Sequence, residues 1–125
     1  MEVRAMEIDE TSLTPLFIQV AQWLENEILK DHIQEEEQVP STNQFASLYH
    51  INPATARKGF TLLTDEGILY KKRGIGMFVA TGAKEKIKER AKERFQTETL
   101  KNVLEEARQL GMTKEEMIAM IQENF

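Results

Sequence analysis

The stretch NPATARKGFTLLTDEGILYKKRGIGMFV, residues 52–79, decides the fold. It begins with Asn52, a residue that can cap a helix, and Pro53, which is well accommodated at the first helical position. Gly67 supplies the left-handed conformation that ends many helices. The stretch therefore predicts a helix from Pro53 to Gly67. Its inward stripe comprises Ala56, Phe60 and Leu63.

Two β-prone segments follow this helix. Residues 68–72 and 77–80 flank Arg73-Gly74-Ile75-Gly76, in which the glycines provide the positive φ that a tight hairpin turn requires. A lone hairpin is barely stable in water, so its apolar side should pack against the helices. We therefore expect a two-stranded β-wing.

Another helix start lies shortly before Asn52. Ser41 and Gln44 have the spacing of a capping box, which predicts a short helix to about Tyr49. Phe45 and Leu48 are its expected core residues. Because two capped helices joined by so short a turn form a helix-turn-helix unit, the later helix can present its N-terminal outward side chains to a partner.

Thr14 and Pro15 mark an earlier helix start, with the Thr hydroxyl as the expected cap. They predict a first helix from Pro15 to about Lys30, whereas residues 1–12 are expected to be flexible. The acidic segment that follows the first helix reads as a solvated loop. It ends in at most a short strand at Gln38–Val39.

The C-terminal third is helical in pattern and highly charged. Residues 83–110 form one helical stretch, Gly111 ends it, and Thr113 begins a last helix to about Asn124. The apolar stripe changes sides near residues 96–99, so the helix either bends there or packs on different neighbours in its two halves. The apolar residues are too few to close a core of their own. We therefore expect a homodimer interface made by Leu100, Val103, Leu104, Ala107, Leu110, Met117, Ile118 and Ile121.

These elements predict a mostly α (α+β) fold. Residues 13–82 are expected to form an N-terminal winged helix-turn-helix with a two-stranded β-wing. Residues 83–125 are expected to form a short helical dimerisation appendage. A chain of 125 residues has room for one small domain and such an appendage.

Composition narrows the functional classes. No apolar run approaches the roughly 18 residues of a membrane span, the first ten residues lack a signal-peptide pattern, and there is no cysteine. We therefore expect a cytoplasmic protein. The net charge is -5, but residues 39–82 carry five Lys or Arg against two Asp or Glu, a local charge of +3. The middle third is thus a candidate for binding a polyanion.

The sequence offers no pattern for catalysis, a metal or a cofactor. His32 and His50 lie in unrelated segments without ligand spacing, and Glu35-Glu36-Glu37 is better interpreted as a solvated loop. Ser41 has no nearby base and is better interpreted as a cap. The Gly-x-Gly of the wing lacks the third glycine and following helix of a dinucleotide site. We expect that the protein is not an enzyme.

The start of the helix from Pro53 favours DNA binding. Residues 52–58 place small and polar side chains first and cations one turn later. A helix N-terminus attracts phosphate, and small side chains allow a close approach to DNA. An ordinary solvated helix is the alternative for this segment alone, and Lys71-Lys72-Arg73 is also typical of an exposed strand edge. The order of capped helix, short turn, capped helix, glycine and basic hairpin is more specific.

Residues 14–82 resemble the winged-helix DNA-binding domain of the GntR family of bacterial transcription regulators. The resemblance rests on Pro40-Ser41, NPATARKGF, Asp65-Glu66-Gly67-Ile68 and GIGMFV. The NP start and the short C-terminal part are most similar to the YtrA-like subfamily, whose two-helix appendage dimerises and whose members often control transporter operons. Met77 departs from the usual Gly-x-Gly-Thr-Phe-Val ending, and Asn43 stands where the wider family commonly has Arg.

The resemblance implies double-stranded DNA as the partner. It implies contacts from the residues after Pro-Ser, the first turn of the recognition helix, Arg57 and the wing glycine. Together with the pattern of cations, it gives the expected DNA-contacting residues. They are Ser41, Thr42, Asn43, Asn52, Ala54, Thr55, Arg57, Lys58, Lys71, Lys72, Arg73, Gly74 and Gly76.

The sequence therefore predicts a sequence-specific transcriptional regulator, a repressor rather than an activator, acting as a homodimer on a palindromic operator. The alternative from another class is a winged-helix adaptor whose C-terminal helices dock another protein. A ligand sensor ranks lower, because roughly 43 residues are little material for a drug-sized pocket. No cofactor, metal or membrane is expected, and a small-molecule effector is not indicated.

Overall fold

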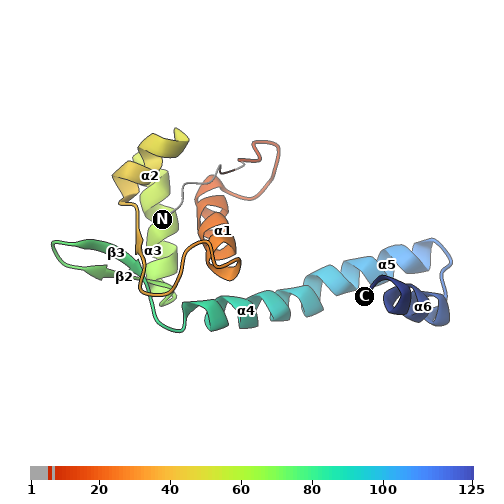
Figure 1. The fold of residues 1–125 in the computed structure, drawn as a ribbon. Coiled ribbons are helices and arrows are strands. Elements are labelled where there is room, and N and C mark those ends of the chain that lie inside the picture. Colours follow the sequence, from red (N-terminus) through yellow and green to blue (C-terminus); the bar gives the residue numbers. More distant parts are fainter. Residues whose placement is uncertain (1–5, 7) are drawn as a thin grey trace. The chain divides into compact units, whose positions relative to one another are not determined.

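The computed structural model describes residue 6 and residues 8–125. The chain divides into two compact units, Met1–Lys88 and Glu89–Phe125, here the N-terminal and C-terminal units, each described by itself. Figure 1 shows the order of their elements. The expected flexible segment 1–12 falls partly outside the described residues. Residues 9–14 lie against α1, where the Gln19 side chain donates to the carbonyl oxygens of Asp9 and Thr14 at 3.1 and 3.0 Å.

The N-terminal unit contains three complete helices. Ser41 and Gln44 form the expected capping box at the second, and Asn52 caps the third ahead of Pro53. Gly67, with φ of +76°, follows the third helix as expected. The helices are α1 (Leu16–Leu29), α2 (Thr42–Tyr49) and α3 (Pro53–Asp65).

Two expected details of these helices are wrong. Pro15 rather than Thr14 is the N-cap of α1, without a side-chain cap, because the first carbonyl to accept a helical N–H is that of Pro15. Leu48 is 47% exposed, whereas Ala46 is buried beside Phe45. At 100° per residue, Ala46 lies on one side of Phe45 and Leu48 on the other, and only the first side faces the core.

The wing belongs to a three-stranded antiparallel sheet rather than an isolated hairpin. Its strands are β1 (Gln38–Val39), β2 (Leu69–Lys72) and β3 (Gly76–Val79), in the order β1-β3-β2. Gln38 pairs with Phe78 and Val39 with Met77, so β1 covers the edge of β3 that the hairpin alone would leave open. The short strand predicted at Gln38–Val39 is thereby confirmed, and it supplies the third strand.

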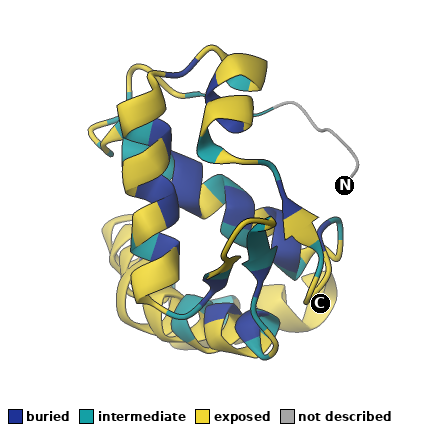
Figure 2. Ribbon diagram, turned by 90° about the vertical axis from the view of Figure 1, so that its left-hand side faces the viewer, coloured by how far each residue is buried: buried dark blue, intermediate teal, exposed yellow. Residues whose placement is uncertain are grey.

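The core of the N-terminal unit is shared by the helices and the sheet. The stripe of α3 predicted from the sequence is buried as expected, and Figure 2 shows buried positions along the inner sides of the helices. At Gly59, α1 and α3 approach closely: a Cβ atom there would lie 2.7 Å from the Phe17 carbonyl oxygen and 3.0 Å from Val20 Cγ1. The largest fully buried side chains include Leu24, Ile28, Phe45, Phe60, Leu63 and Val79.

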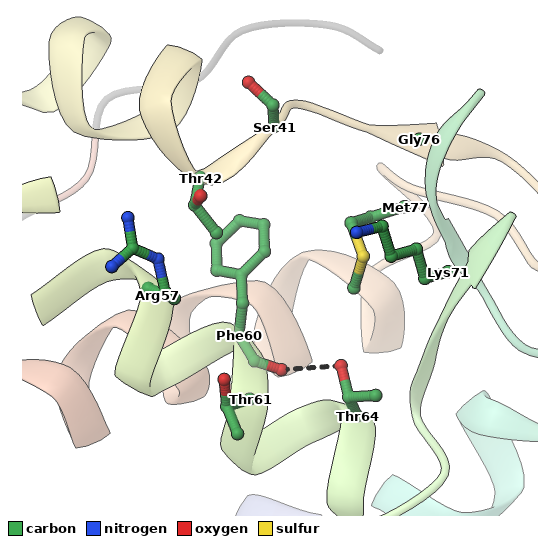
Figure 3. Close-up of a pocket in the computed structure, with 9 residues that line it drawn as sticks. All are labelled: Ser41, Thr42, Arg57, Phe60, Thr61, Thr64, Lys71, Gly76 and Met77. Carbon is green, nitrogen blue, oxygen red and sulfur yellow. Dashed lines mark hydrogen bonds between the residues drawn. The ribbon is translucent and has the colours of Figure 1, made fainter. Parts of the chain in front are cut away.

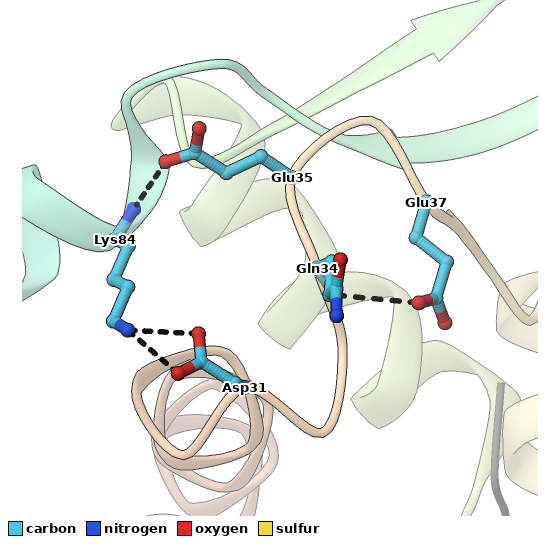
Figure 4. A network of polar contacts seen from close by, with 5 residues as sticks. All are labelled: Asp31, Gln34, Glu35, Glu37 and Lys84. Atoms are coloured by element: carbon cyan, nitrogen blue, oxygen red, sulfur yellow. Dashed lines mark hydrogen bonds and ion pairs between the residues drawn. The ribbon is translucent and has the colours of Figure 1, made fainter.

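Helix α4 (Ala83–Arg94) begins inside the N-terminal unit. Its first turn is held by the loop after α1 (Figure 4): Lys84 Nζ contacts both carboxylate oxygens of Asp31 at 2.8 Å, and the Lys84 N–H donates to Glu35 Oε1 at 3.3 Å. Ala83 and Ile87 are buried. The acidic loop therefore contacts the start of α4, and the burial of Ala83 and Ile87 in the core holds it in place.

The C-terminal unit contains a π-helical segment where the apolar stripe changes sides. Residues Phe95–Thr99 are π-helical and α5 (Leu100–Gln109) follows directly. A π turn uses one more residue than an α turn, so it rotates the side chains that follow it relative to those before it. Gly111, with φ of +72°, ends α5, and α6 (Lys114–Asn124) begins where Thr113 Oγ1 accepts the Glu116 N–H at 3.1 Å.

No helix within the described part of the chain has the length and apolar character needed to cross a membrane.

Candidate nucleic-acid interface

The first turns of α2 and α3 are built by short polar caps. Ser41 Oγ accepts the Gln44 N–H at 3.1 Å, and Gln44 Oε1 accepts the Ser41 N–H at 3.0 Å. Asn52 Oδ1 accepts the Ala54 N–H at 2.8 Å. The side chains of Ser41 and Asn52 therefore shape the helix starts. Asn43, Asn52 and Ala54 are exposed, and Thr42 and Thr55 are half-buried.

Helices α2 and α3 and the wing enclose a groove of about 400 Å³. Arg57 of α3 and Lys71 of β2 both line the groove, and Figure 3 shows them on opposite sides of Phe60. The groove thus brings together predicted residues from three separate elements. Its lining is Ser41, Thr42, Arg57, Phe60, Thr61, Thr64, Lys71, Gly76 and Met77.

The adjacent cations Arg57 and Lys58 lie on different sides of α3. Arg57 is exposed and lines the groove. Lys58 Nζ instead lies 4.2 Å from the centre of the Phe17 ring on α1, a cation–π contact. Successive residues of a helix point about 100° apart, so one of the two faces the wing and the other faces α1.

Lys71 and Lys72 lie on opposite faces of the wing, because successive strand residues alternate. Lys71 pairs with Met77 and lines the groove beside α3. Lys72 Nζ lies 4.6 Å from the centre of the Phe78 ring on the other face, where Phe78 stacks on Tyr70 with centroids 5.9 Å apart. The two lysines therefore project from different surfaces of the wing.

The aromatic face of the wing is tied to the acidic loop. The Tyr70 hydroxyl donates to Glu36 Oε1 at 2.6 Å. This hydrogen bond holds the pKa of the Glu36 carboxyl below its ordinary value, and it is also the main cause of the raised pKa of Tyr70.

The wing tip is pinned by β1. The Ile75 N–H donates to the Lys72 carbonyl oxygen at 3.0 Å, and Gln38 Nε2 donates to the Ile75 carbonyl oxygen at 3.1 Å. Gly74 has φ of +79° and open space around it, whereas a Cβ at Gly76 would lie 2.5 Å from Gln38 Nε2. Gly74 is therefore free to approach a partner closely, and Gly76 accommodates the side chain that fixes the turn.

Sequence reasoning missed part of this interface. Thr61 and Thr64 line the groove one and two turns after Arg57 on α3. The spacing of four residues from Arg57 would have identified Thr61. Thr64 donates its hydroxyl to the Phe60 carbonyl oxygen at 2.9 Å, so it forms part of the wall. Gln38 gave no local signal, because its role depends on the pairing of β1 with β3.

The predicted dimer residues gather in the C-terminal unit. An apolar groove of about 610 Å³ lies between α5 and α6 and is lined by all of them except Leu110. Leu110 is 70% exposed, Ala107 is buried, and Leu100, Val103, Leu104, Ile118 and Ile121 are exposed. The sequence did not identify Phe95, Met112 and the rim cations Arg108 and Lys114 as members of this groove.

Among the described residues, no group of three His, Asp or Glu side chains is placed so that it could hold a metal ion.

The comparisons with known proteins point to one family. The model of "Bacterial regulatory proteins, gntR family" matches residues 17–79. The HTH-type transcriptional repressor YtrA of Bacillus subtilis is 30% identical over 94% of this chain and 90% of its own length. This match over nearly the full length confirms the YtrA-like resemblance.

Solved structures agree with the fold. A transcriptional regulator from Oenococcus oeni superposes with a TM-score of 0.79, at 24% identity, over 97% of this chain and 98% of its own. The DNA-binding domain of AraR in complex with operator ORE1 matches 62% of this chain and 95% of its own, with a TM-score of 0.52 and 24% identity. The relatives are regulators, not enzymes. The chain therefore belongs to the gntR family of bacterial regulatory proteins and is a transcriptional regulator with a winged-helix DNA-binding domain.

Proposed function

We propose that this regulator is a repressor that binds a palindromic operator as a homodimer. In each subunit the first turns of α3 enter the major groove and the wing tip reaches the adjacent minor groove. The observation that carries the proposal is the groove in which Arg57, Lys71 and the cap of α2 come together from three elements. This arrangement supports simultaneous contact with bases and with the phosphates that border them.

The roles within the interface follow from the side chains. Arg57 is exposed one turn into α3, where a guanidinium can donate two hydrogen bonds to a guanine edge. The positive dipole ends at the N-termini of α2 and α3 attract phosphates, and the small Ala54 keeps the approach open. Lys71 and Arg73 would neutralise phosphates beside the wing.

The homodimer proposal rests on the apolar groove between α5 and α6. Several large apolar side chains line a surface with few polar groups, among them Leu100, Leu104 and Ile118. Burial of this surface against a second copy would remove it from water, at roughly 25 cal/mol for each Å² of apolar area. A dimer also converts the second half-site contact into an intramolecular one.

The resemblance to YtrA favours repression as the regulatory mode, because that relative is named a repressor. In this proposal the protein acts in the cytoplasm. Occupancy of an operator is sufficient for this mechanism and needs no cofactor. Control of a transporter operon is the corresponding proposal for the target. An effector is not required by the proposal.

Selection of binding sites from random double-stranded DNA, with the mass of the complex in solution, tests the proposal. We expect a two-fold symmetric motif bound by two chains. If the dimer neutralises on the order of 6 to 10 phosphates, the log–log dependence of affinity on salt should have a slope of about -5 to -9. Failure to enrich any sequence, or affinity indifferent to salt, would favour the protein-interaction adaptor instead.

A further inference from the structure

The wing tip carries a branched apolar side chain in an exposed position. Ile75 is 64% exposed in the hairpin turn, with Arg73 and Gly74 immediately before it. The other large apolar side chains of the hairpin are at least partly covered: Met77 lies on the side of α3, and Phe78 stacks on Tyr70 on the opposite face. Ile75 therefore packs on neither face of the hairpin.

The backbone of Ile75 is already engaged within the wing. Its N–H donates to the Lys72 carbonyl oxygen, and its own carbonyl accepts from Gln38 Nε2. At this position the tip offers a partner an aliphatic side chain alone. Because the turn is fixed on both sides, that side chain is presented from a defined place.

An exposed apolar residue is ordinary in itself. Leu48, 47% exposed on α2, is an example that needs no explanation. Ile75 differs because it stands at the tip of the element that carries Lys71, Lys72 and Arg73. The wing therefore combines several cationic side chains with one exposed apolar side chain at its tip.

We propose that Ile75 is a specificity-determining residue that disfavours base pairs carrying the guanine 2-amino group in the minor groove. The inference rests on the proposed function, in which the wing tip enters that groove. A·T and T·A pairs present only acceptors on the groove floor, whereas G·C adds the N2 amino donor. An aliphatic side chain against this amino group leaves a buried donor without an acceptor, which is costly. The amino group also occupies depth that the side chain would fill.

Base analogues test this reading without altering the major groove. The operator recovered by selection is synthesised with adenine and, separately, with every adenine replaced by 2,6-diaminopurine. The analogue adds a 2-amino group in the minor groove and leaves N6 and N7 unchanged. The dissociation constants of both duplexes are measured by fluorescence anisotropy for the full chain and for Ile75→Ala. Arg73→Ala is the control for a neighbouring cation, and Leu48→Ala for loss of an exposed apolar side chain.

The full chain should bind the diaminopurine operator at least about fivefold more weakly, in line with the cost of one unfavourable base pair. Ile75→Ala should reduce this ratio to about twofold or less, whereas Arg73→Ala and Leu48→Ala should keep the wild-type ratio. Equal ratios for the full chain and Ile75→Ala, or no loss with the full chain, would overturn the assignment of Ile75 and leave the operator model intact. If selection enriches no sequence, the proposed function fails and this inference fails with it.

Discussion

At the scale of single residues, neighbours in the sequence serve different surfaces. Arg57 faces the groove while Lys58 lies over Phe17, and Lys71 faces the groove while Lys72 lies over Phe78. The sequence identified the four cations but not which of them face the groove. The side that each one faces depends on the rotation of the helix, or the alternation of the strand, relative to the element packed against it.

Arg57→Ala should weaken operator binding by about 1 to 3 kcal/mol and relax base preference at one position in each half-site. The reason is that a guanidinium in the groove can recognise a base edge. Lys71→Ala is the matched control. Loss of a lysine that contacts phosphate should weaken binding to all DNA sequences alike. Repeating the selection with both variants provides the measurement. An unchanged motif with Arg57→Ala would make Arg57 a phosphate contact.

Tyr70→Phe should lower stability at neutral pH by removing the hydroxyl that donates to Glu36, while the stacked ring remains. The hydrogen bond lowers the pKa of Glu36 from its ordinary value of 4.5. Its contribution is therefore present above pH 4.5 and is lost as the pH falls through the lowered pKa of the folded state. Urea unfolding of both proteins between pH 7 and pH 3 should show curves that converge in acid. A difference that stays constant would assign the loss to packing.

At the scale of elements, several helix bounds followed from local chemistry, although the cap expected at Thr14 did not form. The caps at Ser41 and Asn52 and the glycines at positions 67 and 111 act within one turn, so a sequence can reveal them. The pairing of β1 with β3 could not be predicted in the same way, because it joins residues 38 and 40 positions apart. The π-helical segment was visible only as a change of stripe near residues 96–99.

Gly59→Ala should destabilise the N-terminal unit. A Cβ would lie 2.7 Å from the backbone oxygen of Phe17, so α1 must move, and overpacking of this kind costs about 1 to 3 kcal/mol. The better helix propensity of alanine offsets up to about 1 kcal/mol of this cost. Thermal or urea unfolding measures the difference, with Thr61→Ala on the exposed side of α3 as the control. Equal stability of Gly59→Ala and the parent chain would mean that the two helices can separate freely.

The candidate interface was predictable to a similar degree. The sequence indicated the recognition helix and the basic hairpin, because each carries its own caps, turns and charges. Thr61 and Gln38 were missed: Thr61 lay beyond the first turn, and Gln38 acts through a strand pairing. The apolar residues of α5 and α6 were visible as a stripe without a partner in the chain. What covers them is a property of an assembly, which periodicity alone does not specify.

At the scale of the whole molecule, the two units divide the work that we propose. The N-terminal unit holds the cationic groove, and the C-terminal unit holds the apolar one. The two grooves share no lining residue. Substitutions in one groove should therefore leave the chemistry of the other unchanged.

Leu104→Glu should convert the proposed dimer into a monomer, because it places an unpaired charge in the apolar groove. Gln109→Glu is the matched control, since it adds the same charge at an exposed position outside that groove. Light scattering should give a dimer for the parent chain and the control. Operator affinity should fall at least about 100-fold for Leu104→Glu but not for the control, if dimerisation lets the two subunits bind both half-sites together. A monomeric parent chain with tight operator binding would end the two-fold model.

The hydrogen bond from Gln38 to the wing turn has a calorimetric consequence. Segments that fold only on binding bury extra apolar surface at that moment, and the heat capacity of association becomes strongly negative. A hairpin already held by β1 has completed that ordering in the free protein. Operator titrations at several temperatures should therefore give a modest heat capacity change, set by the contact surface itself. Gln38→Ala should make it more negative as the wing turn becomes ordered only on DNA.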